Sequence, residues 1–241
     1  MKKLTLVLFA LFLVVATAFV FVSRNKTSTE LEAGSSQGVH YIQIRGALDA
    51  NGVRKFSKLL KRIEETDTES VILVIDSPGG ELSAGFNLSD RILESEMKTY
   101  CLVHEGMATA LYAVASSDAI YFTKEGAVGS AEVILGNSNP ELNRIKDELS
   151  ALIRDQFEKI SSQTGTKVDL LRAMTDANLE LIRDGEVITK KGELLSLNPK
   201  KAIQLGFSSG TVDSIDELAM TINKSDNQSV VTTPDAARPT S

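Results

Sequence analysis

The chain has 241 residues, of which 42% are apolar and 24% charged, a composition typical of a globular protein with one substantial core. The net charge of −6, without a clustered basic segment, argues against a protein that binds nucleic acid. A single cysteine, Cys101, and two histidines leave no internal disulfide and too few ligands for a closed zinc site. We therefore expect no metal and no cofactor.

The N-terminal segment carries a targeting signal. Lys2 and Lys3 precede an uncharged run, Leu4–Ser23, whose length of about 20 residues suffices for a helix to cross a bilayer. This length favours an uncleaved signal anchor over residues 1–24. The alternative is a signal peptide cleaved near Ala16–Ala18, which would leave the domain secreted. In either case we expect the domain to lie outside the cytoplasm, on the periplasmic or extracytoplasmic side.

Polar segments border the domain that we expect over residues 38–223. Residues 25–37 are predicted to form a linker, and residues 224–241 have too few large apolar side chains to fold, which predicts a disordered tail.

The start of the domain predicts a strand, a helix and a second strand. Val39–Ile44 is expected to form the first strand, and apolar residues at helical spacing predict an amphipathic helix over Asn51–Glu65. Val71–Ile75 is a continuous apolar run, which is typical of a strand covered on both faces by helices. The three elements predict a βαβ unit and hence a parallel sheet.

Strands and helices continue to alternate along the rest of the domain. Asn198 and Ser214 are expected to cap two late helices. The other predicted elements are a helix carrying Leu82–Ile92, strands Tyr100–Val103 and Ala119–Phe122, a small-residue helix at Ala108–Ser117, an extended segment Gly126–Leu135 and a long helix Pro140–Ser162.

The buried strand ends in the turn Asp76-Ser77-Pro78-Gly79-Gly80. Glycine allows a positive φ and a close approach, so the N–H groups of such a turn can point at an anion or a peptide oxygen. The alternative is a tight connection without a ligand. We interpret Asp76 as a side chain that bonds the turn amides.

Further segments favour the ligand-binding interpretation. Gly106–Asp118 leads into Ala119–Phe122 and then Gly126–Ser130. In this order the segments resemble the ClpP/crotonase superfamily and, within it, the NfeD-like membrane-associated ClpP-class serine peptidases. Segments 191–198 and 201–207 are similar to the NfeD-like C-terminal part as well. The resemblance implies an α/β fold of repeated ββα units, with a mainly parallel sheet flanked by helices.

The resemblance also implies an oxyanion and peptide-binding site at the two glycine turns, which supply Gly79, Gly80, Gly129 and Ser130. At the position of the serine nucleophile stands Ala108, which has no nucleophilic atom. Thr109 follows it, as an oxyanion N–H donor or an alternative nucleophile.

At the position of the general base, the resemblance places Arg144. A guanidinium stays protonated and cannot accept the proton of a nucleophile. Lys146, two residues further on, is the alternative base.

These departures predict a protein that has kept the peptidase fold and lost the catalytic dyad, so whether it is an enzyme stays open. Its expected role is a peptide-binding or assembly partner in membrane-protein quality control. The alternatives are an active serine-type endopeptidase that cleaves apolar membrane-protein segments and, less favoured, acyl-CoA chemistry of the crotonase type. The expected partners are a peptide or membrane-protein segment, a second copy of the chain and a stomatin-like membrane protein.

Overall fold

The computed structural model describes residues 28–131 and 140–231. The signal anchor or signal peptide predicted over residues 1–24 lies outside this part of the chain. Within these two ranges, every helix is too short or too polar to cross a bilayer.

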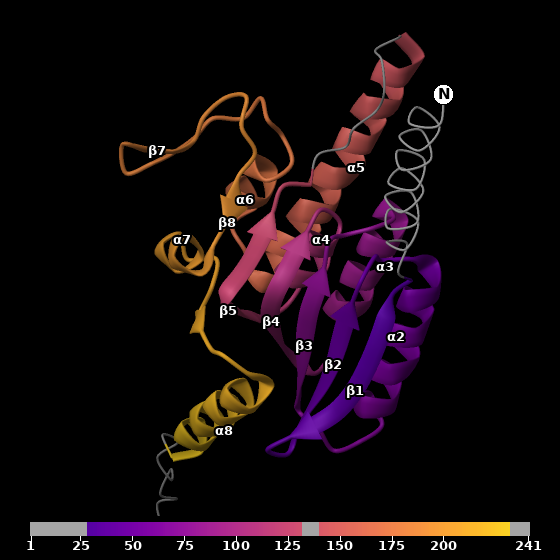
Figure 1. Cartoon of the computed structure of the whole chain (residues 1–241), viewed down its shortest axis with the longest axis vertical. Helices are drawn as coiled ribbons and strands as arrows, with labels where there is room; N and C mark the ends of the chain where they lie inside the picture. The colour runs from indigo at the N-terminus through magenta and orange to yellow at the C-terminus, as the bar shows by residue number, and fades with distance from the viewer. Residues whose placement is uncertain (1–27, 132–139, 232–241) are drawn as a thin grey trace, which may run out of the picture.

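A seven-stranded sheet forms the centre of the domain (Figure 1), in the order β1-β2-β3-β4-β5-β8, with β9 also paired to β5. Four central strands run parallel: β2 (Val39–Arg45), β3 (Ser70–Ser77), β4 (Lys98–Met107) and β5 (Ala119–Gly129). Strand β1 (Glu30–Ser36) pairs antiparallel with β2 at one edge. At the other edge, β5 pairs with β8 (Ser196–Leu197) and β9 (Gly210–Thr211), while β6 (Leu181–Arg183) and β7 (Glu186–Thr189) form a separate hairpin.

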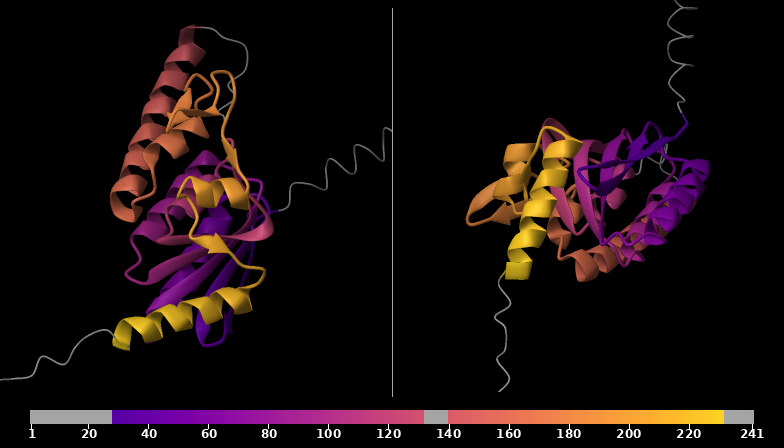
Figure 2. Two further views of the ribbon diagram at one scale, coloured as in Figure 1. Left: turned by 90° about the vertical axis from the view of Figure 1, so that its left-hand side faces the viewer. Right: turned by 90° about the horizontal axis from the view of Figure 1, so that it is seen from below.

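Helices cover both faces of this sheet (Figures 1 and 2). One face packs against α2 (Ala50–Glu64), α3 (Leu82–Leu93), α4 (Ala110–Ala115) and α5 (Pro140–Thr164), and the opposite face packs against α8 (Ile215–Val231). The short helices α6 (Val168–Ala173) and α7 (Pro199–Gln204) complete the domain beyond β5.

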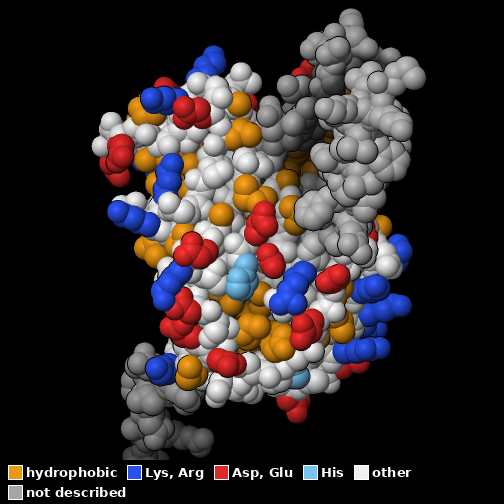
Figure 3. All heavy atoms as spheres, in the orientation of Figure 1, with side chains coloured by type: hydrophobic (Ala, Val, Ile, Leu, Met, Phe, Trp, Pro, Cys, Tyr) orange, Lys and Arg blue, Asp and Glu red, His pale blue; other side chains and the backbone are white. Residues whose placement is uncertain are grey.

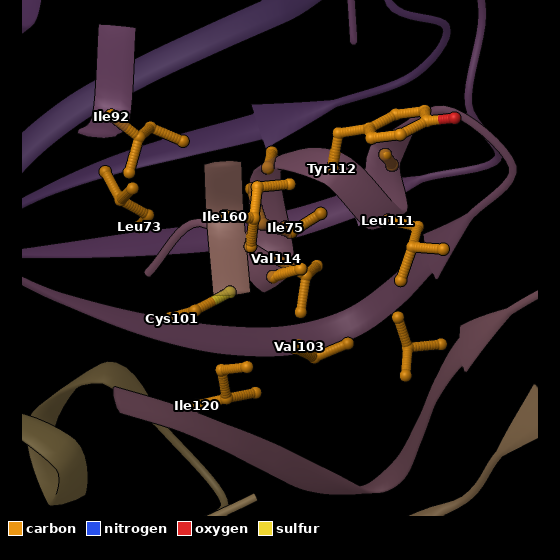
Figure 4. Packing of buried hydrophobic residues seen from close by; sticks show 14 of the residues in the cluster. Leu73, Ile75, Ile92, Cys101, Val103, Leu111, Tyr112, Val114, Ile120 and Ile160 are labelled. Atoms are coloured by element: carbon orange, nitrogen blue, oxygen red, sulfur yellow. The ribbon is translucent and has the colours of Figure 1, made fainter. Parts of the chain in front are cut away.

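The apolar run of β3 is explained by this two-sided packing. Leu73 and Ile75 point into the larger core beneath α2–α5, whereas Ile72 and Val74 point into the smaller core beneath α8. Side chains alternate along a strand, so only a continuous apolar sequence satisfies both cores. Figure 4 shows part of the larger core, in which Ile75 lies close to Val114 of α4.

Helix α5 is held against α3 and α4 by apolar and polar contacts. Phe157 stacks on Tyr112 of α4 with ring centroids 5.3 Å apart. The Gln156 amide donates to the Ser89 hydroxyl at 2.9 Å, and Ser89 in turn lies 2.6 Å from the hydroxyl of Ser116, at the end of α4. The helix that follows the candidate nucleophile position is thus fixed from two sides.

The α/β fold with a mainly parallel sheet is confirmed, and both predicted caps are present: Asn198 Oδ1 accepts from the Lys201 N–H and Ser214 Oγ from the Glu217 N–H. Two boundaries differ from the prediction. Strand β1 lies inside the predicted linker 25–37, and α8 continues to Val231, beyond residue 223. The sequence analysis also missed α6 and the β6–β7 hairpin.

Candidate functional site

The glycine turn follows the carboxyl end of β3 and is held by Ser77. Its hydroxyl donates to the Gly46 carbonyl at 2.7 Å and accepts from the Gly79 N–H at 3.2 Å. Gly79 has a φ of 98°, a value that glycine adopts at low cost. Our interpretation of Asp76 is therefore wrong, since the neighbouring Ser77 bonds the turn amide.

The loop between β2 and α2 supports the turn from the other side. Leu48 donates its N–H to the Gly79 carbonyl at 2.8 Å and accepts from the Glu81 N–H at 2.9 Å. A Cβ on Gly80 would lie 2.1 Å from the Leu48 carbonyl oxygen, so this close approach requires glycine. Leu48 was not predicted from the sequence, because main-chain atoms make its hydrogen bonds and any residue type could supply them.

Ala108 lies directly against the turn, just after β4. Its φ of 46° is in the left-handed region, which costs a non-glycine residue about 1–2 kcal/mol. A Cβ built on Gly79 would lie 2.6 Å from the Cβ of Ala108 and 2.9 Å from the backbone nitrogen of Thr109. The structure thus brings Gly79, Ala108 and the start of α4 together.

Thr109 lies between the glycine turn and α3. A Cβ on Gly85 of α3 would lie 2.9 Å from the Cβ of Thr109, so the threonine side chain packs against α3. The side chain is 9% exposed, and its hydroxyl has no hydrogen-bond partner in the described chain. Among the described residues, no hydrogen bond engages the N–H groups of Gly80 and Thr109, which leaves two donors beside Ala108.

Gly129 and Ser130 lie at the same edge of the sheet. Gly129 pairs with Met107, the last residue of β4, so the end of β5 lies beside Ala108. Both residues have positive φ, 128° and 38°, and Ser130 donates its N–H to the Leu195 carbonyl at 3.3 Å. The next residue, Ala131, is buried and donates its N–H to the Met174 carbonyl at 2.9 Å.

Of the two candidate base residues, only Arg144 has a side chain that the structure describes. The Arg144 side chain is 73% exposed and lies 3.9 Å from Glu148 on the next turn of α5. A guanidinium is not a general base, so Arg144 does not supply one. Lys146 lies on α5, but its side chain is outside the described residues.

The single cysteine of the chain, Cys101, lies buried in the core. Burial raises the pKa of the Cys101 thiol, which keeps it protonated in the core. In the described ranges, no three or more His, Cys, Asp or Glu side chains are grouped so as to hold a metal ion. On the face in Figure 3, acidic and basic side chains are mixed rather than gathered into one basic patch.

A cavity of about 440 Å³ lies elsewhere, between α5 and the segment after α6. Its lining includes Ile153, Phe157 and Arg172, and none of the predicted site residues. Among the described residues, the turn beside Ala108 offers backbone N–H groups that can hold a carbonyl oxygen.

Known proteins with related sequences are membrane proteins. The membrane protein NfeD1b of Bacillus subtilis (strain 168) is 27% identical over 183 residues, which are 76% of this chain and 40% of that protein. The membrane-bound protease PH1510 of Pyrococcus horikoshii is 23% identical over 185 residues, 75% of this chain and 38% of that protein. The chain therefore spans less than half the length of either relative.

Solved structures establish the fold. A mutant of the 1510-N membrane-bound stomatin-specific protease matches with a TM-score of 0.57 and 21% identity, covering 73% of this chain and 80% of that one. A second mutant of that protease, in complex with a substrate peptide, also has a TM-score of 0.57, with 21% identity over 73% of this chain and 75% of that one. A ClpP1 mutant from Listeria monocytogenes matches at 0.55 and 15% identity, over 74% and 94% of the two chains.

The fold is thus ClpP-like, and the sequence adds the family. A family model described as the NfeD1b N-terminal domain matches residues 38–233, nearly the whole described chain. The chain belongs to the NfeD1b N-terminal domain family.

Proposed function

We propose that this protein holds an extended peptide at the carboxyl edge of its sheet and does not cleave it. One observation carries the proposal: Ala108 adopts a left-handed conformation against Gly79, beside two N–H groups with no partner in the described chain. Backbone strain of this kind persists where the surrounding structure enforces it. The proposal is therefore that the sharp turn that would present a nucleophile is retained at Ala108. Its side chain is a methyl group, which cannot attack a carbonyl.

The second missing part is the base. A serine or threonine hydroxyl becomes a nucleophile only when a neighbouring group accepts its proton. Arg144 cannot do so. Thr109, the alternative nucleophile, packs its Cβ against Gly85 of α3, and its hydroxyl is buried without a hydrogen-bond partner in the described chain. These features support binding over an endopeptidase reaction.

The proposed setting is a membrane surface outside the cytoplasm. The apolar run Leu4–Ser23 supports an N-terminal anchor, and both relatives are named as membrane proteins. The structural relative is named as a stomatin-specific protease, so a segment of a stomatin-like membrane protein is the first peptide to test.

A cross-linking and cleavage experiment on the full chain tests this function. The detergent-solubilised protein is incubated with a fluorescent extended peptide that carries a photoreactive group. We expect cross-linking without cleavage, and cleavage only in the double variant Ala108→Ser/Arg144→Lys, which adds a hydroxyl and a base that can titrate.

Thr109→Ala and Thr189→Ala serve as a matched pair in this experiment. Both threonines are buried and neither hydroxyl has a partner in the described chain, but Thr189 lies in β7, outside the central sheet. The proposal would be overturned if the natural sequence cleaved the peptide and this cleavage disappeared in Thr109→Ala but persisted in Thr189→Ala. Absence of any cross-link would overturn it as well.

A further inference from the structure

The chain enters the domain at the same edge of the sheet as the candidate site. Glu30, the first residue of β1, pairs with Arg45, the last residue of β2. Strand β1 therefore starts where the parallel strands end (Figure 1), and Gly79 and Ala108 follow β3 and β4 at that edge.

Thr29 fastens this start of the domain. It is 5% exposed, its hydroxyl donates to the Ala47 carbonyl at 2.7 Å, and it accepts from the Asp49 N–H at 3.0 Å. A Cβ on Gly52 of α2 would lie 2.3 Å from the Thr29 side chain, so glycine is required for this contact. Leu48, between the two bonded residues, makes the hydrogen bonds to the glycine turn. The chain leading to the N-terminal apolar run is thus attached to the loop that supports the candidate site.

Only a short stretch of chain joins the apolar run Leu4–Ser23 to the buried Thr29. Ser23 ends the apolar run, and Thr29 lies six residues further along the chain. Six fully extended residues reach at most about 20 Å. If Leu4–Ser23 spans the bilayer, as the proposed function has it, the carboxyl edge cannot lie far from the membrane surface.

Two exposed apolar side chains lie at this end of the molecule. Ile182 and Val187 are cross-strand partners in the β6–β7 hairpin, 53% and 45% exposed. Figures 1 and 2 place the hairpin toward the end at which β5 finishes, and α8 at the opposite end. An exposed apolar pair of this kind is typical of a surface that contacts another protein or a membrane.

We propose that the carboxyl edge of the sheet faces the bilayer, and that the candidate site receives the segment of a membrane protein that directly follows a transmembrane helix. This inference rests on the proposed function for its anchor and its peptide. The reach of about 20 Å corresponds to about six residues of extended substrate, at about 3.3 Å per residue. A segment about 3–8 residues from the membrane is therefore bound better than one 20 residues away.

The orientation is tested first, without any peptide. The full chain is labelled with a fluorophore at Ile182→Cys or, as the matched control, at Met220→Cys, an equally exposed apolar position on α8. The buried Cys101 does not compete for the label. In phosphatidylcholine proteoliposomes with a headgroup quencher, we expect strong quenching at position 182 and at least threefold less at position 220.

The outcomes separate this inference from the proposed function. Failure of the protein to float with the vesicles overturns both the anchor and the inference. Equal quenching at the two positions overturns the inference alone.

A second arm uses transmembrane peptides that carry the photoreactive group 4, 8 or 20 residues beyond the helix. Cross-linking that falls at least fivefold at 20 residues supports the inference. Equal cross-linking at all three distances overturns it and leaves peptide binding intact. Insertion of ten Gly-Ser residues after Lys26 should restore cross-linking at the distant position.

Discussion

Replacement of Gly79 by alanine tests the geometry of the candidate site most directly. The new Cβ would meet the Cβ of Ala108 at 2.6 Å and the backbone nitrogen of Thr109 at 2.9 Å, and backbone atoms cannot move aside easily. The positive φ costs about 1–2 kcal/mol, and overpacking of this kind adds about 1–3 kcal/mol. We expect Gly79→Ala to lower the free energy of unfolding by about 2–5 kcal/mol.

Gly192→Ala separates the two contributions. Gly192 has nearly the same φ, 96° against 98°, but a Cβ there would have nothing within 4 Å. Gly192→Ala should lower the free energy of unfolding only by the cost of the positive φ, about 1–2 kcal/mol. The difference between the variants, about 1–3 kcal/mol, then measures the contact between the turn and Ala108.

Urea unfolding followed by circular dichroism supplies the measurement. With a urea m-value of about 2 kcal/mol/M, the midpoint of Gly79→Ala should lie about 0.5–1.5 M below that of Gly192→Ala, with m unchanged. Equal midpoints for the two variants would refute the close approach of Gly79 to Ala108, and with it the assembly of the site.

Four further variants test the burial and capping of individual side chains. Thr109→Val removes a buried hydroxyl that has no partner in the described chain, so it should raise the free energy of unfolding by about 1 kcal/mol. Thr99→Val loses a hydrogen bond of 2.8 Å to the Asp118 carboxylate and should lower the free energy of unfolding by about 1–3 kcal/mol. Changes of the same sign for both variants in urea unfolding would contradict this reasoning. Phe157→Ala leaves a cavity against Tyr112 and should cost about 3–5 kcal/mol in the same assay. Asp49 caps α2, and hydrogen bonds from backbone amides lower the pKa of its carboxyl. Its charge therefore stabilises the fold above the unfolded pKa of about 3.9, and the advantage over Asp49→Asn should disappear as the pH falls through the lower folded pKa; an advantage that persists at pH 2 would be inconsistent with this origin.

The sequence predicts the central elements well because burial dictates their residue types. Val71–Ile75 has to be apolar throughout, since both of its faces are covered, and α2 presents its buried residues at helical spacing. Strand β1 has no comparable signature. It is an edge strand with mostly exposed side chains, so Glu30–Ser36 reads as a polar linker. The β6–β7 hairpin was detectable, because Asp184-Gly185 between apolar residues is a strong hairpin signal.

The candidate site is predictable only in part. Two adjacent glycines mark the turn after β3, but alanine is a residue type from which a left-handed conformation at position 108 is not expected. The support of the turn by Leu48 comes from main-chain atoms and leaves no trace in the side chain. Ser77 and Asp76 are neighbours of similar turn chemistry, and only the geometry distinguishes which one bonds the Gly79 amide.

The order of the strands bears on how the domain forms. From β1 to β5, each strand pairs with the one immediately before it in the chain, and only β8 and β9 return to an earlier partner, β5. Most long-range pairing therefore joins segments close in sequence, which lowers the entropy lost in closing loops. During synthesis, this sheet can therefore form strand by strand from β1 onward, in the order in which its segments leave the ribosome.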